Sequence, residues 1–246
     1  MKTYIKQAVP SHVIVRSKVV FRYAQHLTNG SFFKLATLKT PDTAEGFKSQ
    51  IIEKQEIKRG ELFDNKLNNI RLTASKLSGL IIPRGAIFSF WHLVGNPSEG
   101  NGFQTSRIIR NGEVDFEIGG GVCQVSGLVY VAALKAGLKI LERHNHSVDI
   151  YQEHERIAPL GSDATVVYGA KDLQFLNDSD SAIQLLFNTL NEEEIGITVL
   201  SSSKIEEKIL YFDRQDAGQK RIVTTYGEWQ GMREQLVVSI YKIQVK

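Results

Sequence analysis

One short segment of the chain carries the residue types that nucleophilic chemistry needs. The single cysteine, Cys123, comes two residues after a run of three glycines, Gly119, Gly120 and Gly121. Glycine loses more backbone entropy on folding than any other residue, so such a run is expected where the backbone needs positive φ or a ligand approaches closely. A helix over residues 122–136 is expected to begin here, which places Cys123 in its first turn.

A cysteine in the first turn of a helix has a favourable environment for its thiolate. Unpaired amide groups and the positive end of the helix dipole lie there, and thiols in such places are more acidic than free ones. The amides of residues 121–123 could also hold the oxyanion that forms when a thiolate attacks a carbonyl. The pattern indicates a nucleophile. The opposite interpretation, an inert buried cysteine, stays open because lone cysteines are commonly buried.

Two histidines, His144 and His146, are candidate bases for this thiol. A helix over 123–136 is about 20 Å long and a strand over 138–146 about 26 Å, at roughly 1.5 and 3.3 Å per residue. If the strand returns antiparallel to the helix, both histidines arrive near the helix start and point to the same face of the strand. One of them is then expected to serve as general base, and this geometry leaves the choice open.

Metal binding is the competing interpretation of the same residues. Cys123, His144, His146 and Asp163 could form a tetrahedral zinc site, and the His-x-His spacing occurs in metal sites. A structural zinc site normally recruits more than one thiolate, and this chain has one cysteine. We therefore expect neither a metal nor another cofactor.

The composition excludes several classes of protein. The 246 residues are 42% hydrophobic and 23% charged, which is ordinary for a globular chain and rules out a disordered or fibrous one. The net charge of +3 does not indicate a nucleic-acid or membrane partner. A single cysteine excludes an intramolecular disulfide and fits a reducing compartment. Without a leader pattern or an apolar stretch of about 20 residues, we expect a cytoplasmic protein with no membrane span.

The hydrophobic pattern predicts an α+β fold with a helical N-terminal half, a β-rich C-terminal half and a central unit of glycine loop, helix and return strand. Two or three helices are expected in the first half. The clearest covers 65–78, because Leu67, Ile70, Ala74 and Leu77 recur at helical spacing before Gly79, whereas 43–58 is only weakly helical and 1–40 has no clean period. Strands are expected at 87–90, at 106–110 and 113–118 around the turn Asn111-Gly112, and at 138–143, 147–151, 164–168, 181–188, 195–200, 207–212, 221–226 and 235–245.

Between about Leu77 and Leu186 the sequence resembles the VanW family. The resemblance is carried by Pro83-Arg84-Gly85-Ala86-Ile87-Phe88-Ser89-Phe90, Val94-Gly95, Gly102-Phe103, Gly119-Gly120-Gly121-Val122-Cys123-Gln124-Val125-Ser126, Glu142-Arg143, His146-Ser147, Gly161-Ser162-Asp163-Ala164-Thr165-Val166, Asp172-Leu173 and Asn177. Phe90-Trp91-His92-Leu93-Val94-Gly95 is especially similar to the branch of the family found in VanB-type vancomycin-resistance clusters. The long glycine–cysteine block makes this resemblance specific.

The resemblance implies chemistry on cell-wall peptides. Some extracytoplasmic members resemble peptidoglycan L,D-transpeptidases in which the cysteine of this motif is the nucleophile. Carried over, Cys123 is the nucleophile, and His146 matches the family histidine better than His144. The resemblance assigns no role to Asp163, which we expect to orient His146. Members of that group follow the block with Thr, whereas Gly127 stands here.

We therefore expect a cysteine acyl transferase or peptidase of cell-wall metabolism or the glycopeptide response. The alternative is a non-catalytic accessory protein that binds muropeptides. Its partner would be a cell-wall-type peptide or a small molecule containing a D-amino acid. Either Arg143 or Arg110 could pair a substrate carboxylate, and ligand contacts are expected from Gly119, Gly120, Gly121, Gln124, Ser126, Arg143 and Ser147. Residues 119–123, 143–147 and 161–165 should converge on one cleft.

Three segments are expected along the chain: an N-terminal helical or mixed region at 1–76, a VanW-like core at 77–186 and a β-rich extension at 187–246 that packs on the core. The sequence leaves the oligomeric state open.

Overall fold

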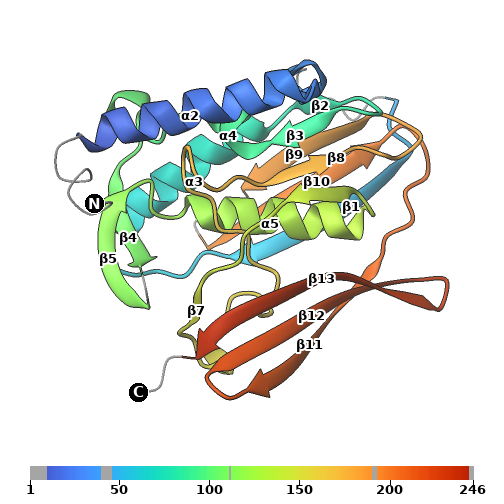
Figure 1. Ribbon diagram of the computed structural model, residues 1–246. Coiled ribbons are helices and arrows are strands. Elements are labelled where there is room, and N and C mark those ends of the chain that lie inside the picture. The colour runs from blue at the N-terminus through green and yellow to red at the C-terminus, as the bar shows by residue number, and fades with distance from the viewer. Residues whose placement is uncertain (1–9, 40–45, 111, 190–192, 244–246) are drawn as a thin grey trace.

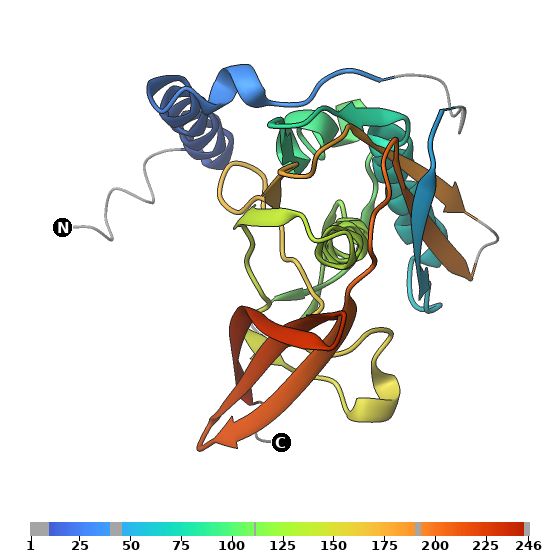
Figure 2. The same cartoon turned by 90° about the vertical axis from the view of Figure 1, so that its right-hand side faces the viewer.

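Helix α5 (Val122–Lys135) lies at the centre of the fold, as the computed structural model shows from the side in Figure 1 and along the helix axis in Figure 2. The structure describes residues 10–39, 46–110, 112–189 and 193–243. Most side chains of α5 are buried, in agreement with its apolar sequence on all sides. Cys123 stands in its first turn, as the sequence predicts.

The main sheet packs against α5 and α3 (Phe63–Leu77). Its four antiparallel strands run in the order β1 (Ser49–Glu56), β10 (Glu194–Ser201), β9 (Ile183–Thr189) and β2 (Leu80–Ile82). The apolar face of α3 is buried, at Leu67, Ile70, Ala74 and Leu77, which confirms the predicted amphipathic helix. Strand β1 comes from the expected segment 1–76, β2 from 77–186 and β10 from 187–246. The sheet therefore combines strands from all three expected segments.

A second, smaller sheet lies on the other side of α5. It has the order β3 (Ile87–Ser89), β8 (Gln174–Leu176), β6 (Lys139–Glu142), and the short helix α4 (Phe90–Val94) follows β3 directly. The rings of Phe88 and Phe175 stack across β3 and β8 at a centroid distance of 4.5 Å. Strand β6 lies at one end of this sheet, and the chain runs from α5 through β6 towards His144 and His146.

The C-terminal strands form a separate layer beneath α5 (Figure 1). The strands β11 (Ile209–Ala217), β12 (Lys220–Trp229) and β13 (Met232–Ile243) are antiparallel, and β7 (Val148–Asp149) joins β13 in parallel at two residues. The remaining strands β4 (Thr105–Arg110) and β5 (Glu113–Ile118) form the predicted hairpin; Asn111 of its turn lies outside the described residues. Single 3-10 turns occur at η1 (Ser31–Lys34), η2 (Glu99–Asn101) and η3 (Glu153–Glu155).

The α+β class and the strand-rich C-terminal half are confirmed, and several local predictions are wrong. The weakly helical segment 43–58 contains strand β1, because an edge strand with one buried side carries too few apolar residues to show its period. The expected strand 164–168 is irregular apart from one bridge at Val167, since Asp163 and Ala164 there are held by side chains of other elements. The described residues contain four α-helices, and the additional ones are α2 (Ser11–Thr28) and the five-residue α4.

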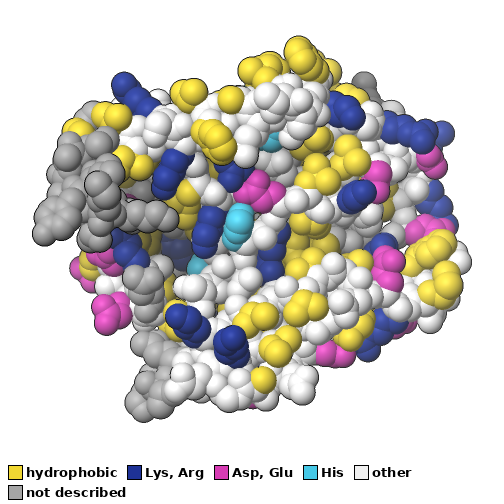
Figure 3. Space-filling model, in the orientation of Figure 1, with side chains coloured by type: hydrophobic (Ala, Val, Ile, Leu, Met, Phe, Trp, Pro, Cys, Tyr) yellow, Lys and Arg dark blue, Asp and Glu magenta, His cyan; other side chains and the backbone are white. Residues whose placement is uncertain are grey.

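Helix α2 escaped prediction because none of its described side chains is fully buried, and its half-buried Val15, Val19 and Tyr23 stand among basic residues. Polar contacts also hold it: Arg22 donates to both oxygens of Glu142 at 2.7 and 2.9 Å and to the carbonyl of Ala170. Val20 and Phe21 on its outer side are exposed, and hydrophobic side chains gather along this edge in Figure 3. None of the described helices is long and apolar enough to cross a membrane.

Candidate active site

The three glycines before Cys123 are explained by backbone shape and close packing. Gly119 and Gly121 have φ values of 91° and 99°, in the left-handed region that favours glycine. Gly120 lies against β4, where a Cβ atom would be 2.8 Å from the carbonyl oxygen of Arg107 and from Cβ of Ser106. These constraints account for the run without a bound ligand, and the predicted ligand contacts of the three glycines stay a prediction.

A buried asparagine, which the sequence reasoning missed, fixes this loop. The Nδ2 atom of Asn69 donates to the carbonyl oxygens of Gly120 at 2.9 Å and Gln104 at 2.8 Å, and its Oδ1 accepts from the amide of Gln104. Asn69 is fully buried on the apolar side of α3. A polar residue on the apolar face of a predicted helix was the signal that could have found it.

Cys123 presents a partly exposed thiol beside an amide that has no acceptor. The amides of Val122 and Gln124 donate to Gly119 and Gly121 at 3.2 and 3.0 Å, whereas no hydrogen bond of the Cys123 amide is found in the described part of the chain. The thiol lies 3.7 Å from the carbonyl oxygen of Val166, and its proximity to His146 contributes to raising the pKa of that ring. A free amide next to the sulfur is the donor that an oxyanion on a reacting carbonyl needs.

His146 lies between the thiol and a carboxylate. Its Nδ1 is 2.6 Å from Oδ2 of Asp163, and its backbone amide donates to the same oxygen at 2.6 Å. With Nδ1 engaged by Asp163, the other ring nitrogen, Nε2, remains for Cys123. The His146 side chain is 40% exposed, so a substrate could reach it.

The electrostatics favour a charged imidazole on His146 and a charged carboxylate on Asp163. Burial works against a charged imidazole, but hydrogen bonding and electrostatic interaction with Asp163 and Cys123 outweigh it and raise the pKa of His146 to about 10. Burial also works against the Asp163 carboxylate, yet the hydrogen bond from His146 and the charge of Arg143 lower its pKa to about 2. The ring next to the sulfur is thus an imidazolium at neutral pH.

The second oxygen of Asp163 is held by two further donors, Arg143 and Tyr241. Tyr241 donates its hydroxyl to Oδ1 at 2.5 Å, and an Nη atom of Arg143 donates to it at 3.0 Å. The guanidinium of Arg143 also donates to the carbonyls of Gly161 and Asp163 and to Ser239. Only 4% of its side chain is exposed. The guanidinium of Arg143 is thus engaged inside the protein, and the expected pairing with a substrate carboxylate stays a prediction.

His144 belongs to a different cluster from His146. Its Nε2 lies 2.9 Å from Oε1 of Glu142, which also accepts from Arg22 of α2 and from the amide of Asp172. The structure therefore places His146, and not His144, beside Cys123 and Asp163. The other arginine considered for a substrate carboxylate, Arg110, is exposed on the β4–β5 hairpin and pairs with carboxylates there, at Asp115 and Glu117.

The other candidate ligand residues hold the site together. Ser126 is fully buried and donates its hydroxyl to the carbonyl of Ala164 at 2.5 Å, which ties the segment 161–165 to α5. The expected ligand contact of Ser126 stays a prediction. Gln124 donates to the carbonyl of Glu56 on β1 at 2.7 Å. The carbonyl of Ser147 accepts from the amide of Lys242 on β13. Residues 119–123, 143–147 and 161–165 thus come together, although the return strand has four residues and not nine.

The donor set does not resemble a zinc centre. Among the described residues there is no group of three or more His, Cys, Asp and Glu side chains that could hold a metal ion. In the competing zinc interpretation His144 would have been the third ligand, but it is hydrogen-bonded to Glu142.

The family model described as "VanW like protein" matches residues 65–200. The chain belongs to the VanW family. This match confirms the resemblance in the sequence, and residues 65–200 include Cys123, His146 and Asp163 together with the strands that carry them.

Two curated relatives are similar to part of this chain. "Vancomycin B-type resistance protein VanW" of Enterococcus faecalis (strain ATCC 700802 / V583) is 36% identical over 132 residues, which are 54% of this chain and 48% of that protein. "Uncharacterized protein YoaR" of Bacillus subtilis (strain 168) is 31% identical over 145 residues, 59% of this chain and 46% of that protein. The chain therefore spans about half the length of the curated relatives it matches. No solved structure matches it.

Proposed function

We propose that this VanW-family protein is a cysteine acyl transferase or peptidase that acts on cell-wall-type peptides, in cell-wall metabolism or the response to glycopeptide antibiotics. The observation that carries the chemistry is the line of side chains Cys123, His146 and Asp163, in which the carboxylate holds Nδ1 of the histidine and leaves Nε2 for the thiol. The vancomycin-resistance relative and the family itself support the cell-wall setting.

In the first half of the reaction the sulfur of Cys123 attacks a peptide or amide carbonyl carbon. In this proposal the sulfur reacts as the thiolate while His146 is the imidazolium, and a bond forms between sulfur and carbon. The negative charge that develops on the carbonyl oxygen is stabilised by the free amide of Cys123. The carbon–nitrogen bond then breaks, and His146 gives its proton to the leaving amine. The product is a thioester on Cys123.

In the second half an amine or water attacks the thioester. His146, now neutral, accepts the proton of the attacking group, and the sulfur leaves as the thiolate paired with the regenerated imidazolium. Asp163 keeps the ring in the tautomer and orientation that both halves require, and Arg143 and Tyr241 fix Asp163 in turn. An amine acceptor gives transpeptidation and water gives hydrolysis.

The test is capture of the thioester by intact mass spectrometry. The wild-type protein is incubated with defined muropeptides and with D-amino acids, and an adduct on Cys123 is expected that is absent from Cys123→Ser and strongly reduced in His146→Ala. His144→Ala is the matched control, because it removes a histidine two residues away that contacts Glu142 instead, and it should form the adduct normally.

Two outcomes would contradict the proposal. The first is the absence of an adduct across the whole panel while wild type and Cys123→Ala bind the muropeptides equally, which would favour the non-catalytic binding protein. The second is an adduct that forms as fast in His146→Ala as in wild type, which would remove the histidine from the chemistry.

A further inference from the structure

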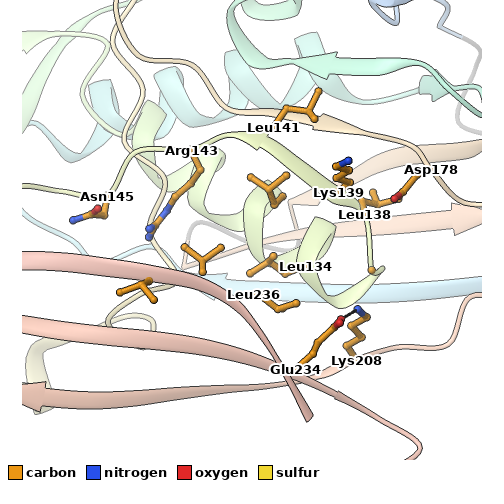
Figure 4. A pocket seen from close by; sticks show the side chains of 14 residues that line it. Leu134, Leu138, Lys139, Leu141, Arg143, Asn145, Asp178, Lys208, Glu234 and Leu236 are labelled. Carbon is orange, nitrogen blue, oxygen red and sulfur yellow. Dashed lines mark hydrogen bonds and ion pairs between the residues drawn. The ribbon is translucent and has the colours of Figure 1, made fainter. Parts of the chain in front are cut away.

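One cleft of the described structure lies beside the candidate active site and not over Cys123. It has a volume of about 570 Å³ and lies between β6 and β13, with Leu134 of α5, Leu138 and Leu236 among its lining residues. Figure 4 shows the side chains of both strands around it, and the surface in Figure 3 is hollowed between β13 and the layer above, with hydrophobic side chains gathered there. The cleft therefore has an apolar floor between two strands.

Both walls of this cleft are strand edges without a strand partner. The strand β6 is the end strand of its sheet, and its outer edge is unpaired within the described residues. The strand β13 pairs with β12 on one edge, and on its other edge only Lys242 and Ile243 pair, with β7. An unpaired edge presents a row of backbone donors and acceptors to any extended chain that approaches it.

Two contacts show which backbone groups of β13 point away from β12. The amide of Lys242 donates to the carbonyl of Ser147, and the carbonyl of Ile240 accepts from the side chain of Asn145 at 2.8 Å. Residues two apart on a strand direct their backbone groups to the same edge, and the register of β13 is regular from 237 to 242. The amide and carbonyl of Val238 therefore also face away from β12, at the wall of the cleft.

This edge is unusual because it carries apolar residues where edge strands normally carry charge. The side chains of Val238 and Ile240 are 48% and 52% exposed, and Leu141 on β6 is 44% exposed. Natural edge strands are commonly protected by lysines, prolines or bulges. The bulges of β13 and β6 lie at Leu236 and Leu141, so neither protects the edge at Val238, whereas the carbonyl of Ile240 is already occupied by Asn145.

The open edge is physically continuous with the active site. The side-chain nitrogen of Asn145 donates both to the carbonyl of Ile240, on the edge, and to the carbonyl of His146, at 2.8 and 2.7 Å. Arg143 and Asn145, which line the cleft, precede His146 in the chain, and Asn145 is its direct neighbour. A chain lying along Val238 and Ile240 therefore runs towards the histidine that faces Cys123.

We propose that the cleft binds the substrate peptide as an added β-strand. Its backbone pairs with the outer edge of β13, alternate apolar side chains rest on the leucine floor, and its reacting carbonyl is directed to Cys123. The four residues of β6 limit the bound segment to about four residues, or roughly 13 Å at 3.3 Å per residue. The inference specifies the extended conformation in which the peptide binds. It rests on the proposed function only in taking that peptide to be the substrate.

The test uses nuclear magnetic resonance titration with an end-blocked pentapeptide of alternating valine and threonine. Saturable binding is expected, with the amide signals of Val238 and Ile240 among those that move most. The same pentapeptide methylated on every backbone nitrogen has no donors and should not bind. Cys123→Ser should bind the unmethylated peptide as wild type does, because strand pairing does not need the thiol.

Two variants of one residue separate backbone from side chain. Val238→Pro removes the amide that faces the cleft, at an edge position that tolerates proline, and should weaken binding about tenfold, or ~1.4 kcal/mol. Val238→Ala is the matched control, because it keeps the amide, and it should bind within about threefold of wild type. Thermal unfolding of both variants checks that the fold is retained.

Several results would overturn the inference: equal binding of the methylated peptide, equal binding by Val238→Pro, signal changes confined to another surface, or a dimer that Val238→Pro dissociates, which would make a second copy the occupant. Thioester formation at an unchanged rate in Val238→Pro would also overturn it while leaving the proposed chemistry intact. Peptide binding at β13 without any thioester in wild type would support the cleft and contradict the chemistry.

Discussion

Replacing Asp163 by asparagine changes one atom of a carboxylate on which four donors converge. The amide and Nδ1 of His146 reach Oδ2, while Arg143 and Tyr241 reach Oδ1. An asparagine must turn its NH2 group towards one of these pairs, and each pair contains a donor that cannot become an acceptor: the backbone amide on one side and the guanidinium on the other. At least two hydrogen bonds to a charged group are therefore weakened or lost.

The size of the effect follows from these contacts. Hydrogen bonds to charged groups contribute about 1.5–3 kcal/mol each, so two of them give roughly 3–6 kcal/mol. Water reaches part of the site, since 23% of the Asp163 side chain and 40% of the His146 side chain are exposed, and this lowers the expected loss of unfolding free energy to roughly 2–4 kcal/mol. The pKa of His146, raised to about 10 in the wild type, should fall by more than about one unit because the partner charge is gone.

Urea unfolding and the pH titration of the His146 ring by nuclear magnetic resonance measure the two effects. Asp172→Asn is the matched control: Asp172 is 1% exposed and accepts from Ser89, Trp91, Leu173 and Gln174, but none of its described hydrogen bonds reaches His146. It should destabilise the fold without moving the His146 titration. A folded Asp163→Asn protein with wild-type stability and an unshifted His146 titration would refute the reasoning.

Three further predictions follow from the same contacts. Gly120→Ala should lose about 1–3 kcal/mol of unfolding free energy, measured in urea, because its Cβ would lie 2.8 Å from the carbonyl oxygen of Arg107. Gly60→Ala is the control and should change the stability little, because an added Cβ would meet no atom within 4 Å. Equal effects of the two substitutions would contradict the packing argument. The pKa of His146 is raised from 6.5 to about 10, and that of Asp163 is lowered from 3.8 to about 2. The stability lost in His146→Ala should therefore be greatest between about pH 4 and 6.5 and should shrink as the pH rises towards 10 or falls towards 2. A thermal-unfolding difference between wild type and His146→Ala that grows above about pH 8 would have the wrong sign. Elemental analysis of protein purified without chelator should find far less than one zinc per chain; about one zinc, lost in Cys123→Ser, would instead favour a metal site.

The sequence predicts the central unit well because its signals are local. The glycine run, the apolar helix after it and Gly137 place Cys123 at the helix start, and the structure has α5 beginning at Val122 and Gly137 at a φ of 71°. The lengths of the helix and the returning chain suffice to bring a histidine back to Cys123 even though β6 is shorter than expected. The choice of His146 came from the His-Ser pair shared with the family, because geometry alone treats both histidines alike.

What the sequence could not predict depends on contacts between distant segments. From the sequence, Arg143 is expected to be available to a substrate carboxylate. In the structure Ser239 and Tyr241, about 100 residues later in the chain, join Arg143 in enclosing Asp163. Helix α2 is held by contacts with distant segments, among them the pairing of Arg22 with Glu142, 120 residues away. The strand β1 pairs with β10 across some 140 residues, and such pairing overrides a weak local helical preference.

The central claim is that His146 activates the thiol of Cys123, and the pH dependence of alkylation tests it most directly. Iodoacetamide labelling of Cys123 is followed by mass spectrometry from about pH 5 to 10 in wild type, His146→Ala and His144→Ala, a range that includes the free-thiol pKa of about 8.5. The imidazolium beside the sulfur predicts rapid labelling of wild type and His144→Ala near pH 6, where a free thiol reacts slowly, and a profile displaced to higher pH in His146→Ala. Labelling of the folded wild type that follows the free-thiol profile, or an identical profile in His146→Ala, would contradict the account.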